Sequence, residues 1–208
     1  DPTSLSYSHL IRIAALCNNA KWDEHSKFRK NRDGTPNFAS PQPYVEELVM
    51  GDGSIEKRVM WKPLGDASES ALLKFVQTYF DIDVYRRDHP KLKEIPFNSS
   101  NKYQVSIHQQ ANEKEHLLVM KGAPERILRR CDTILMNGKE EPFTTERQAA
   151  IEQIQLDLSR KGLRVLGFAE RILDPAIYNN DYVYNTEVPN FPLGDDRESF
   201  PPEKPHTE

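Results

Sequence analysis

The sequence HLLVMKGAPERIL, residues 116–128, constrains the fold more than any other stretch of the chain. Its short apolar run predicts a β-strand that ends at Lys121, and Pro124 suits the first turn of a following helix. Gly122, between them, allows another group to approach the backbone closely. A lysine on an apolar strand face is costly to bury unless its ammonium group has a partner. The stretch therefore predicts a strand-to-helix turn that carries an inward-facing lysine.

Two interpretations of this turn remain open on the residues alone. Lys121 shares a strand face with Leu117 and Val119, so it contacts an anion or a nucleotide, or its side chain reaches past the strand end to water. The helix start at Ala123 and Pro124 offers N–H groups to an anion, or it is an ordinary turn. The spacing by itself favours the ordinary structural interpretation in both cases.

The rest of the chain mixes helical and strand patterns. Many strands are of the half-buried, alternating type, which favours an α+β fold with a twisted, mainly antiparallel sheet flanked by helices. Helices are predicted over 5–20, 65–80, 124–131 and 145–161, a hairpin over 45–61 with Asp52-Gly53 at its turn, and strands over 95–108, 115–121 and 164–173.

Strict alternation of polar and apolar residues over 102–107 predicts one buried face and one polar outer face. The polar face would carry Lys102, Gln104 and Ser106. Phe97 precedes this stretch, and an aromatic ring with a lysine and an amide nearby can hold a nucleic-acid base. The alternative is an ordinary core phenylalanine beside a polar strand face, which the residues alone favour.

Two further charged residues have a structural and a functional interpretation. Asp66 and Glu69 have the D-x-x-E spacing of a helix capping box, which explains Glu69 fully. Alternatively, Glu69 points into a pocket and accepts a hydrogen bond from an exocyclic amine. Arg164 opens a strand on the face of Leu166 and Phe168, where it either binds phosphate or ribose or pairs with an acid of the preceding helix.

Composition and missing motifs exclude several classes of function. The chain has 28 basic and 32 acidic residues and a net charge of -4, so no basic face for nucleic acid is expected. Cys17 and Cys131 lie far apart, which suits a reducing compartment and no zinc site. The histidines lack ligand spacing, and no G-x-S-x-G, Walker or G-x-G-x-x-G motif occurs. We therefore expect no metal site and no catalytic residue.

Several stretches together resemble a known family. In chain order they are DPTS…RIAALCNNA (1–20), GDASESALLK (65–74), IPFNSSNKYQVSIH (95–108), HLLVMKGAPERIL (116–128) and RVLGF (164–168). They are similar to the nucleotide-binding domain of P-type cation-transporting ATPases, most of all to the alpha subunits of the sodium/potassium and proton/potassium pumps. The resemblance covers residues 1–20 and 62–193.

The resemblance implies an ATP site at the matching positions, which are Glu69, Phe97, Lys102, Gln104, Lys121, Gly122, Ala123 and Arg164. Phe97 would stack on the adenine, and Glu69 would accept from its amine, directly or through water. Lys121 would line the bottom of the pocket, and Gly122 and Ala123 would let the base lie close.

The resemblance also implies what lies elsewhere. Lys102 and Gln104 would lie beside the base and ribose, and Arg164 would reach the ribose or phosphates. The phosphorylated aspartate of the family lies in D-K-T-G-T and its magnesium aspartates in G-D-G-x-N-D, and neither motif occurs in these 208 residues. We expect a fragment that binds ATP, with magnesium only through the ATP and a separate phosphorylation domain, and that neither hydrolyses it nor moves ions.

The expected organisation is one nucleotide-binding domain over 1–193 and a disordered tail over 194–208. Residues 21–61 are a variable charged insert, longer and more charged than the animal pumps have, which puts the subclass in doubt. The resemblance implies the cytoplasmic domain of an integral protein of the plasma membrane. Its expected partners are adenine nucleotide, the phosphorylation and actuator domains of the pump and a beta subunit, but not nucleic acid.

Two other functions compete with this one. The insert over 21–61 and the acidic tail could recruit a protein partner, with the nucleotide pocket left vestigial. The chain could also be a stand-alone ATPase, which the missing motifs disfavour. A pull-down that depends on the insert and ignores ATP would favour the first, and phosphate release by the pure chain would favour the second.

Overall fold

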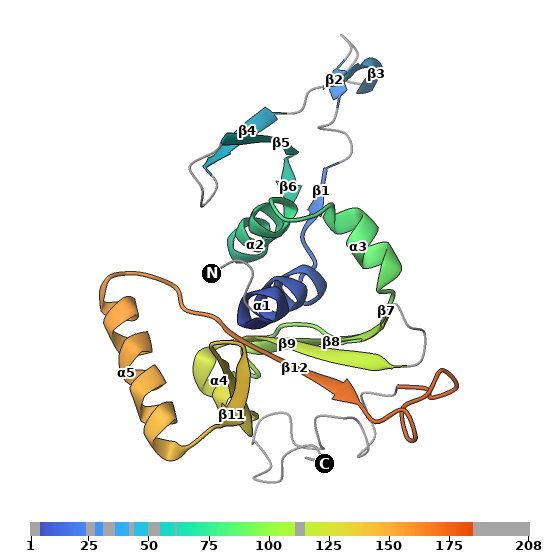
Figure 1. Ribbon diagram of the computed structural model, residues 1–208. Helices are drawn as coiled ribbons and strands as arrows, with labels where there is room; N and C mark the ends of the chain where they lie inside the picture. Colours follow the sequence, from blue (N-terminus) through green and yellow to red (C-terminus); the bar gives the residue numbers. More distant parts are fainter. Residues whose placement is uncertain are drawn as a thin grey trace. The chain divides into compact units, whose positions relative to one another are not determined.

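The computed structural model describes residues 5–23, 28–30, 36–41, 44–49, 55–60, 62–110 and 115–184. The chain divides into two compact units: a sheet unit of Asp1–Cys17 with Arg86–Glu208, and a second unit of Asn18–Tyr85. The chain contains both helices and strands (Figure 1), and every strand pair in the described ranges is antiparallel. The predicted α+β class is confirmed.

The sheet unit is built on a four-stranded sheet in the order β12-β9-β8-β7. Its strands are β7 (Lys91–Ile95), β8 (Tyr103–Gln109), β9 (His116–Gly122) and β12 (Gly167–Leu173). In the register of the sheet, Gln104 of β8 lies opposite Lys121 of β9, and Lys121 lies opposite Phe168 of β12. Nearly all side chains of the two central strands, β8 and β9, are buried on both faces.

Helix α1 (Leu5–Leu16) covers one face of this sheet, packing on β9 and β12. Ser106 Oγ donates to Leu16 O at 3.4 Å, which joins β8 to the end of α1. Arg12 Nε donates to Glu170 Oε2 at 2.9 Å, while His9 and a second Arg12 nitrogen contact the other oxygen of Glu170. These contacts hold a helix over a sheet face that carries polar side chains.

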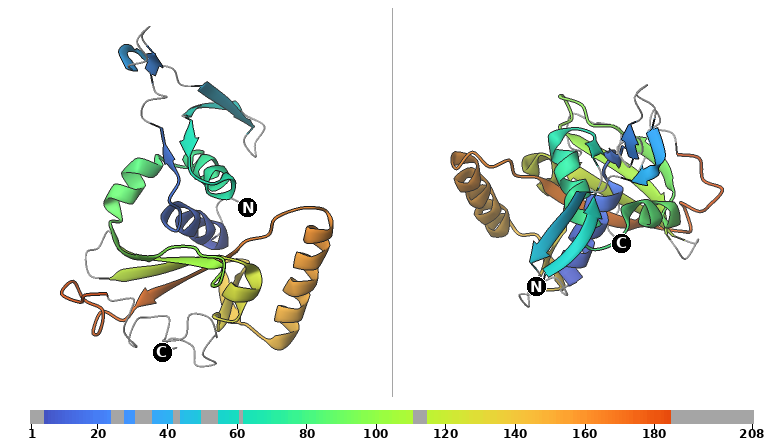
Figure 2. Two further views of the ribbon diagram at one scale, coloured as in Figure 1. Left: turned by 180° about the vertical axis from the view of Figure 1, so that it is seen from behind. Right: turned by 90° about the horizontal axis from the view of Figure 1, so that it is seen from above.

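The opposite face holds the apolar core. It contains Tyr103, Val105, Ile107, Leu118, Met120 and Leu173 of the sheet, together with Ile127 of α4 (Pro124–Leu128) and Tyr184. The view from behind in Figure 2 shows α1 and α4 on opposite sides of the sheet. A Cβ on Gly167 would lie 2.9 Å from Ile127 Cβ, so glycine at this position lets α4 pack against β12.

The remainder of the sheet unit is a hairpin and a longer helix. Strands β10 (Thr133–Met136) and β11 (Lys139–Pro142) pair with each other, and α5 (Thr145–Arg160) follows. Asn137 and Gly138 connect the two strands with positive φ angles of 52° and 76°, as a tight hairpin turn requires. No residue of α5 is fully buried, although its sequence has an apolar stripe.

The second unit contains short paired strands and α2 (Ala67–Gln77). The pairs are β1 (Lys21–Trp22) with β6 (Pro63–Leu64), β2 (Phe28–Lys30) with β3 (Pro36–Pro41), and β4 (Tyr44–Val49) with β5 (Ile55–Met60). The predicted hairpin over 45–61 is confirmed by the β4–β5 pairing, while its turn lies outside the described residues. Asp66 caps α2, accepting from Ser68 N at 2.7 Å and from Glu69 N at 3.0 Å, as predicted.

Several predicted boundaries are wrong, each for a local reason. The first helix ends at Leu16 rather than residue 20, because the Asn18 side chain accepts from Ala20 N and forms a turn. The strand predicted over 95–108 begins at Tyr103, since Lys102 has a φ of 58° and cannot continue a strand. Helix α3 (Ile82–Asp88) and strand β7 were not predicted.

The prediction of a polar outer face on β8 is also wrong. Gln104 and Ser106 are buried, because α1 lies over them. The predicted tail over 194–208 falls outside the described residues, so the predicted domain limits stay predictions. Among the helices of the described ranges, none has both the length and the apolarity that crossing a membrane requires.

Candidate functional site

The end of β9 buries a positive charge. Lys121 is 7% exposed, so its side chain does not reach freely to water, and its partner in the register, Gln104, is 2% exposed. Cross-strand partners share a sheet face, so both lie on the face that α1 covers. Burial raises the pKa of the Cys17 thiol to about 12, and the charge of Lys121 opposes that rise. The structure thus brings together a cation and an amide that were both predicted site residues.

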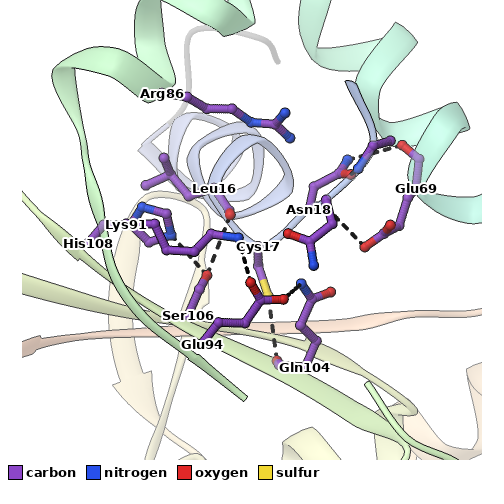
Figure 3. A network of polar contacts seen from close by, with 12 residues as sticks. Leu16, Cys17, Asn18, Glu69, Arg86, Lys91, Glu94, Gln104, Ser106 and His108 are labelled. Atoms are coloured by element: carbon purple, nitrogen blue, oxygen red, sulfur yellow. Dashed lines mark hydrogen bonds and ion pairs between the residues drawn. The ribbon is translucent and has the colours of Figure 1, made fainter. Parts of the chain in front are cut away.

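Polar side chains connect Gln104 to the edge of the sheet. Gln104 Nε2 donates to Glu94 Oε1 at 3.0 Å, and Lys91 Nζ donates to Glu94 Oε2 at 2.7 Å. The Cys17 thiol donates to the Gln104 backbone carbonyl at 3.5 Å. Figure 3 shows Lys91, Glu94 and Gln104 in sequence below the end of α1. The amide of Gln104 is therefore held by a carboxylate that is itself paired.

Next to this network, the buried side chains of His108 and Ser106 contact each other. His108 Nδ1 lies 3.0 Å from the carbonyl oxygen of His89, which can only accept, so Nδ1 carries the proton. Nε2 is then an acceptor for Ser106 Oγ, 2.9 Å away, which can turn its single hydroxyl proton to Nε2 in place of Leu16 O. Burial, together with the charge of Lys91, lowers the pKa of His108 to about 4. His108 is therefore neutral near pH 7.

Gly122 is required by the protein backbone itself. A Cβ at this position would lie 2.4 Å from Lys102 O and 2.6 Å from Tyr103 Cα. Ala123 N donates to the same Lys102 carbonyl at 2.9 Å. The close approach of two strand ends thus accounts for the glycine, whereas the resemblance implied that glycine makes room for a purine ring. Whether Gly122 and Ala123 also contact a ligand stays a prediction.

Lys102 occupies an unusual backbone conformation beside this contact. Its φ of 58° lies in the left-handed region, and its side chain is exposed. Such a conformation costs a non-glycine residue roughly 1–2 kcal/mol, and strain of this kind clusters at functional sites. The role of Lys102 beside a ligand stays a prediction.

Replacing Lys102 by glycine should raise the free energy of unfolding by up to about 1 kcal/mol. The relieved strain of roughly 1–2 kcal/mol outweighs the extra chain entropy of glycine, about 0.5–1 kcal/mol. Urea denaturation measures the difference. Lys161→Gly is a matched control, since Lys161 is exposed and has a φ of -83°. An equal gain in both variants, or a loss in Lys102→Gly, would contradict the strain argument.

Phe97 is an exposed aromatic side chain. It is 61% exposed and lies in the loop between β7 and β8, so the interpretation as an ordinary core phenylalanine is wrong. An exposed ring offers its face to a planar ligand. The loop leads directly into Gln104, so the chain carries the ring toward the end of the sheet where Lys121 is buried.

Arg164 lies on the rim of a depression of about 420 Å³ in the sheet unit. The depression is lined by the start of α4, the C-terminal half of α5 and the segment before β12, namely Ala123, Pro124, Glu125, Gln155, Ser159, Gly162, Leu163, Arg164 and Val165. Arg164 was predicted to open a strand, but β12 begins only at Gly167. The depression joins two predicted site residues, Ala123 and Arg164.

Glu69 belongs to the second unit. Its carboxylate accepts from Asn19 N at 3.2 Å, and its backbone carbonyl accepts from Asn18 Nδ2 at 3.0 Å. Glu69 also lies in the helix turn that Asp66 caps. The turn at residues 18–20 therefore orients the Glu69 carboxylate, in addition to the capping that the sequence predicted.

Comparison with known proteins decides the family. Residues 45–198 match the profile of the family described as P-type ATPase, cytoplasmic domain N, which is most of the chain. The chain belongs to this family. The resemblance inferred from the short motifs is therefore confirmed.

Related proteins match nearly the whole N domain sequence. A sodium/potassium-transporting ATPase subunit alpha from Tetronarce californica is 43% identical over 197 residues, which are 94% of this chain and 17% of that protein. The subunit alpha from Drosophila melanogaster is 41% identical over 196 residues, 93% of this chain and 16% of that protein. Subunit alpha-B from Artemia franciscana is 40% identical over 196 residues, which are 93% of this chain and 17% of that protein. The chain spans less than a fifth of the length of these relatives.

Sequence patterns did not identify some of the buried or partly buried polar residues of this N domain. Glu94 lies in KLKE, which has the composition of a solvent-exposed strand, Ser106 was assigned to an outer face, and His108 was given no role. The sequence of β8 shows alternating polar and apolar residues, but this alternation does not indicate which face of the strand a helix covers. Among the described residues, no cluster of histidine, cysteine and acidic side chains could hold a metal ion.

Proposed function

We propose that this chain binds ATP and presents it for phosphorylation of an aspartate in another domain of a sodium/potassium-ATPase-like cation pump. The observation that carries the proposal is the buried Lys121 beside the buried Gln104, at the sheet end to which the loop of the exposed Phe97 leads. A ring for stacking, an amide for hydrogen bonding and a cation for the phosphates or base are the groups that an adenine nucleotide needs.

The remaining site residues have proposed roles that follow from the family. Glu69 accepts from the adenine amine, Lys102 lies beside the base and ribose, and Gly122 and Ala123 let the base lie close. Arg164, on the rim of a depression about 420 Å³ in volume, reaches the ribose or phosphates. An arginine suits this place because its guanidinium group can form two parallel hydrogen bonds to a phosphate.

The activity of the whole pump is part of the proposal. ATP hydrolysis would drive cation transport across the plasma membrane, with an aspartate and magnesium ligands supplied by a phosphorylation domain. The names of the relatives support the sodium/potassium subclass. An actuator domain and a beta subunit would be further partners.

Binding to the isolated chain should be weak. One base stack contributes roughly 1–3 kcal/mol and each hydrogen bond about 1 kcal/mol, while association costs several kcal/mol. We expect a Kd for ATP on the order of 0.1–1 mM. Isothermal titration calorimetry of the 208-residue chain with ATP tests this. Saturable binding supports the proposal, and no heat up to several millimolar ATP would refute it.

Removal of magnesium should change the affinity little. No metal ligands are proposed in this chain, so the Kd with a chelator present should stay within about threefold of the value with magnesium. The repulsion of free ATP phosphates by the acidic chain is screened at 0.15 M salt. A tenfold weaker affinity in the chelator would show that the chain binds the metal. The same samples should release no phosphate above the blank, and measurable release would favour a stand-alone ATPase.

A further inference from the structure

We propose that Glu94 is a positioning residue that fixes the amide of Gln104 and thereby makes the site prefer a base with a 6-amino group. The inference rests on the proposed nucleotide site. It assigns to Glu94, which carries no role in the set inferred from the motifs, a role in base specificity. All the residues that carry the argument lie in the sheet unit.

The first observation is the direction of the Gln104 amide. Gln104 Nε2 donates to Glu94 Oε1 at 3.0 Å. A carboxylate can only accept, so the amide must turn its NH₂ group toward Glu94 and its oxygen away. Figure 3 shows the Gln104 oxygen on the side opposite Glu94. Glutamine can donate or accept at either end, and Glu94 removes that choice.

The second observation is that Glu94 is itself held. Its other oxygen, Oε2, accepts from Lys91 Nζ at 2.7 Å. Residues three apart in a regular strand point to opposite faces. A register shift between Lys91 and Lys93 inserts an extra residue, so Lys91 lies opposite His108 and Glu94 opposite Ser106, two positions on the same face of β8. The bulge therefore places Lys91 where it can fix the carboxylate.

The third observation is that Gln104 has little freedom of its own. It is 2% exposed, and its backbone carbonyl accepts from the Cys17 thiol at 3.5 Å. In the part of the chain that the structure describes, no hydrogen bond from protein to Gln104 Oε1 is present. The amide oxygen of Gln104 is therefore a fixed acceptor at this end of the sheet.

Base preference follows from this arrangement. The 6-amino group of adenine donates, whereas the 6-oxo group of hypoxanthine or guanine accepts. A fixed amide oxygen pairs with the donor and opposes the acceptor. A site built around a specific hydrogen bond discriminates against an analogue that cannot form it, because a buried polar group is left unpaired. We expect ATP to bind on the order of tenfold more tightly than inosine triphosphate.

The test compares the Kd of ATP with that of inosine triphosphate by calorimetry, in the full 208-residue chain and in Glu94→Gln. The new amide has nearly the same size, but it can donate as well as accept, so it lets the Gln104 amide turn over. The Kd ratio of inosine triphosphate to ATP should fall from on the order of tenfold to about twofold. If Glu94 had a purely structural role, Glu94→Gln would weaken the binding of both nucleotides equally. The Kd ratio would then stay unchanged, which would overturn the inference.

Two further variants keep the test decisive. Glu152→Gln makes the same chemical change in α5, where Glu152 Oε1 accepts from Gln148 Nε2 at 2.8 Å, and should keep the wild-type ratio. Lys91→Met leaves the Glu94 carboxylate in place but removes its hydrogen bond from Lys91, so the ratio should fall by about twofold to threefold. If Glu94→Gln does not fold, the Lys91 variant decides: an unchanged ratio overturns the inference.

The outcomes for the wild-type chain separate this inference from the proposed function. Binding of ATP with a ratio near one keeps the proposed function and overturns the role of Glu94. Absence of binding by either nucleotide overturns the proposed function, and the inference with it. A high ratio that Glu94→Gln abolishes supports both.

Discussion

Replacing Phe97 by alanine is expected to weaken ATP binding by at least about fivefold and to leave the fold intact. A stacked base contributes roughly 1–3 kcal/mol, which corresponds to a loss between about fivefold and 150-fold. Phe97 is 61% exposed, so its removal takes little from the core. Calorimetry gives the affinity, and thermal unfolding followed by circular dichroism gives the stability of the same sample.

Two control variants make the Phe97 result specific. Phe97→Trp keeps a ring for stacking and should bind ATP within about threefold of the wild type. Ile154 is 57% exposed on α5, and Ile154→Ala removes a comparable apolar surface without affecting ATP. Wild-type affinity in a folded Phe97→Ala variant would refute the stacking role. Equal losses in Phe97→Ala and Ile154→Ala would instead indicate a nonspecific effect.

Acid should destabilise the chain through His108. Burial lowers the pKa of His108 from 6.5 to about 4, and the charge of Lys91 acts in the same direction. Between these two pH values the unfolded chain binds a proton that the folded chain excludes, so the free energy of unfolding decreases as the pH falls. The contribution lost between pH 6.5 and pH 4 is about 3 kcal/mol. Urea denaturation at a series of pH values measures it.

The variant His108→Gln isolates this contribution, because glutamine does not titrate. Its free energy of unfolding should be about 3 kcal/mol less dependent on pH over the same interval than that of the wild type. His116→Gln is the matched control, since His116 is also buried and forms hydrogen bonds to Tyr184 and Asn180. If the free energy of unfolding changed with pH in the same way in the wild type and in His108→Gln, the pH dependence could not be assigned to His108.

Local patterns predicted those elements that depend on neighbouring residues. Apolar periodicity and the Asp66 cap predicted α2, and the apolar run before Lys121 predicted β9. Both depend on contacts within a few residues, which the sequence displays directly. The inward orientation of Lys121 was predicted for the same reason, since its strand face is set by Leu117 and Val119.

Contacts between distant residues could not be predicted in this way. The burial of Gln104 depends on α1, which lies some ninety positions earlier in the chain and covers the face that alternation alone assigns to solvent. Glu94 was missed because its importance comes from a register shift and from pairing with Gln104, neither of which leaves a local pattern. The exposure of Phe97 depends on where β8 begins. The strand begins only after Lys102, because the positive φ of Lys102 does not fit a strand.

The central claim is that an adenine nucleotide binds where Lys121 and Gln104 are buried. A titration of the isotopically labelled chain with ATP, followed by amide NMR, tests it most directly. The account predicts saturable shifts centred on Phe97, Lys121 and Gly122, with a Kd on the order of 0.1–1 mM. A folded spectrum that does not move with several millimolar ATP, or that moves only at residues far from these, would contradict it.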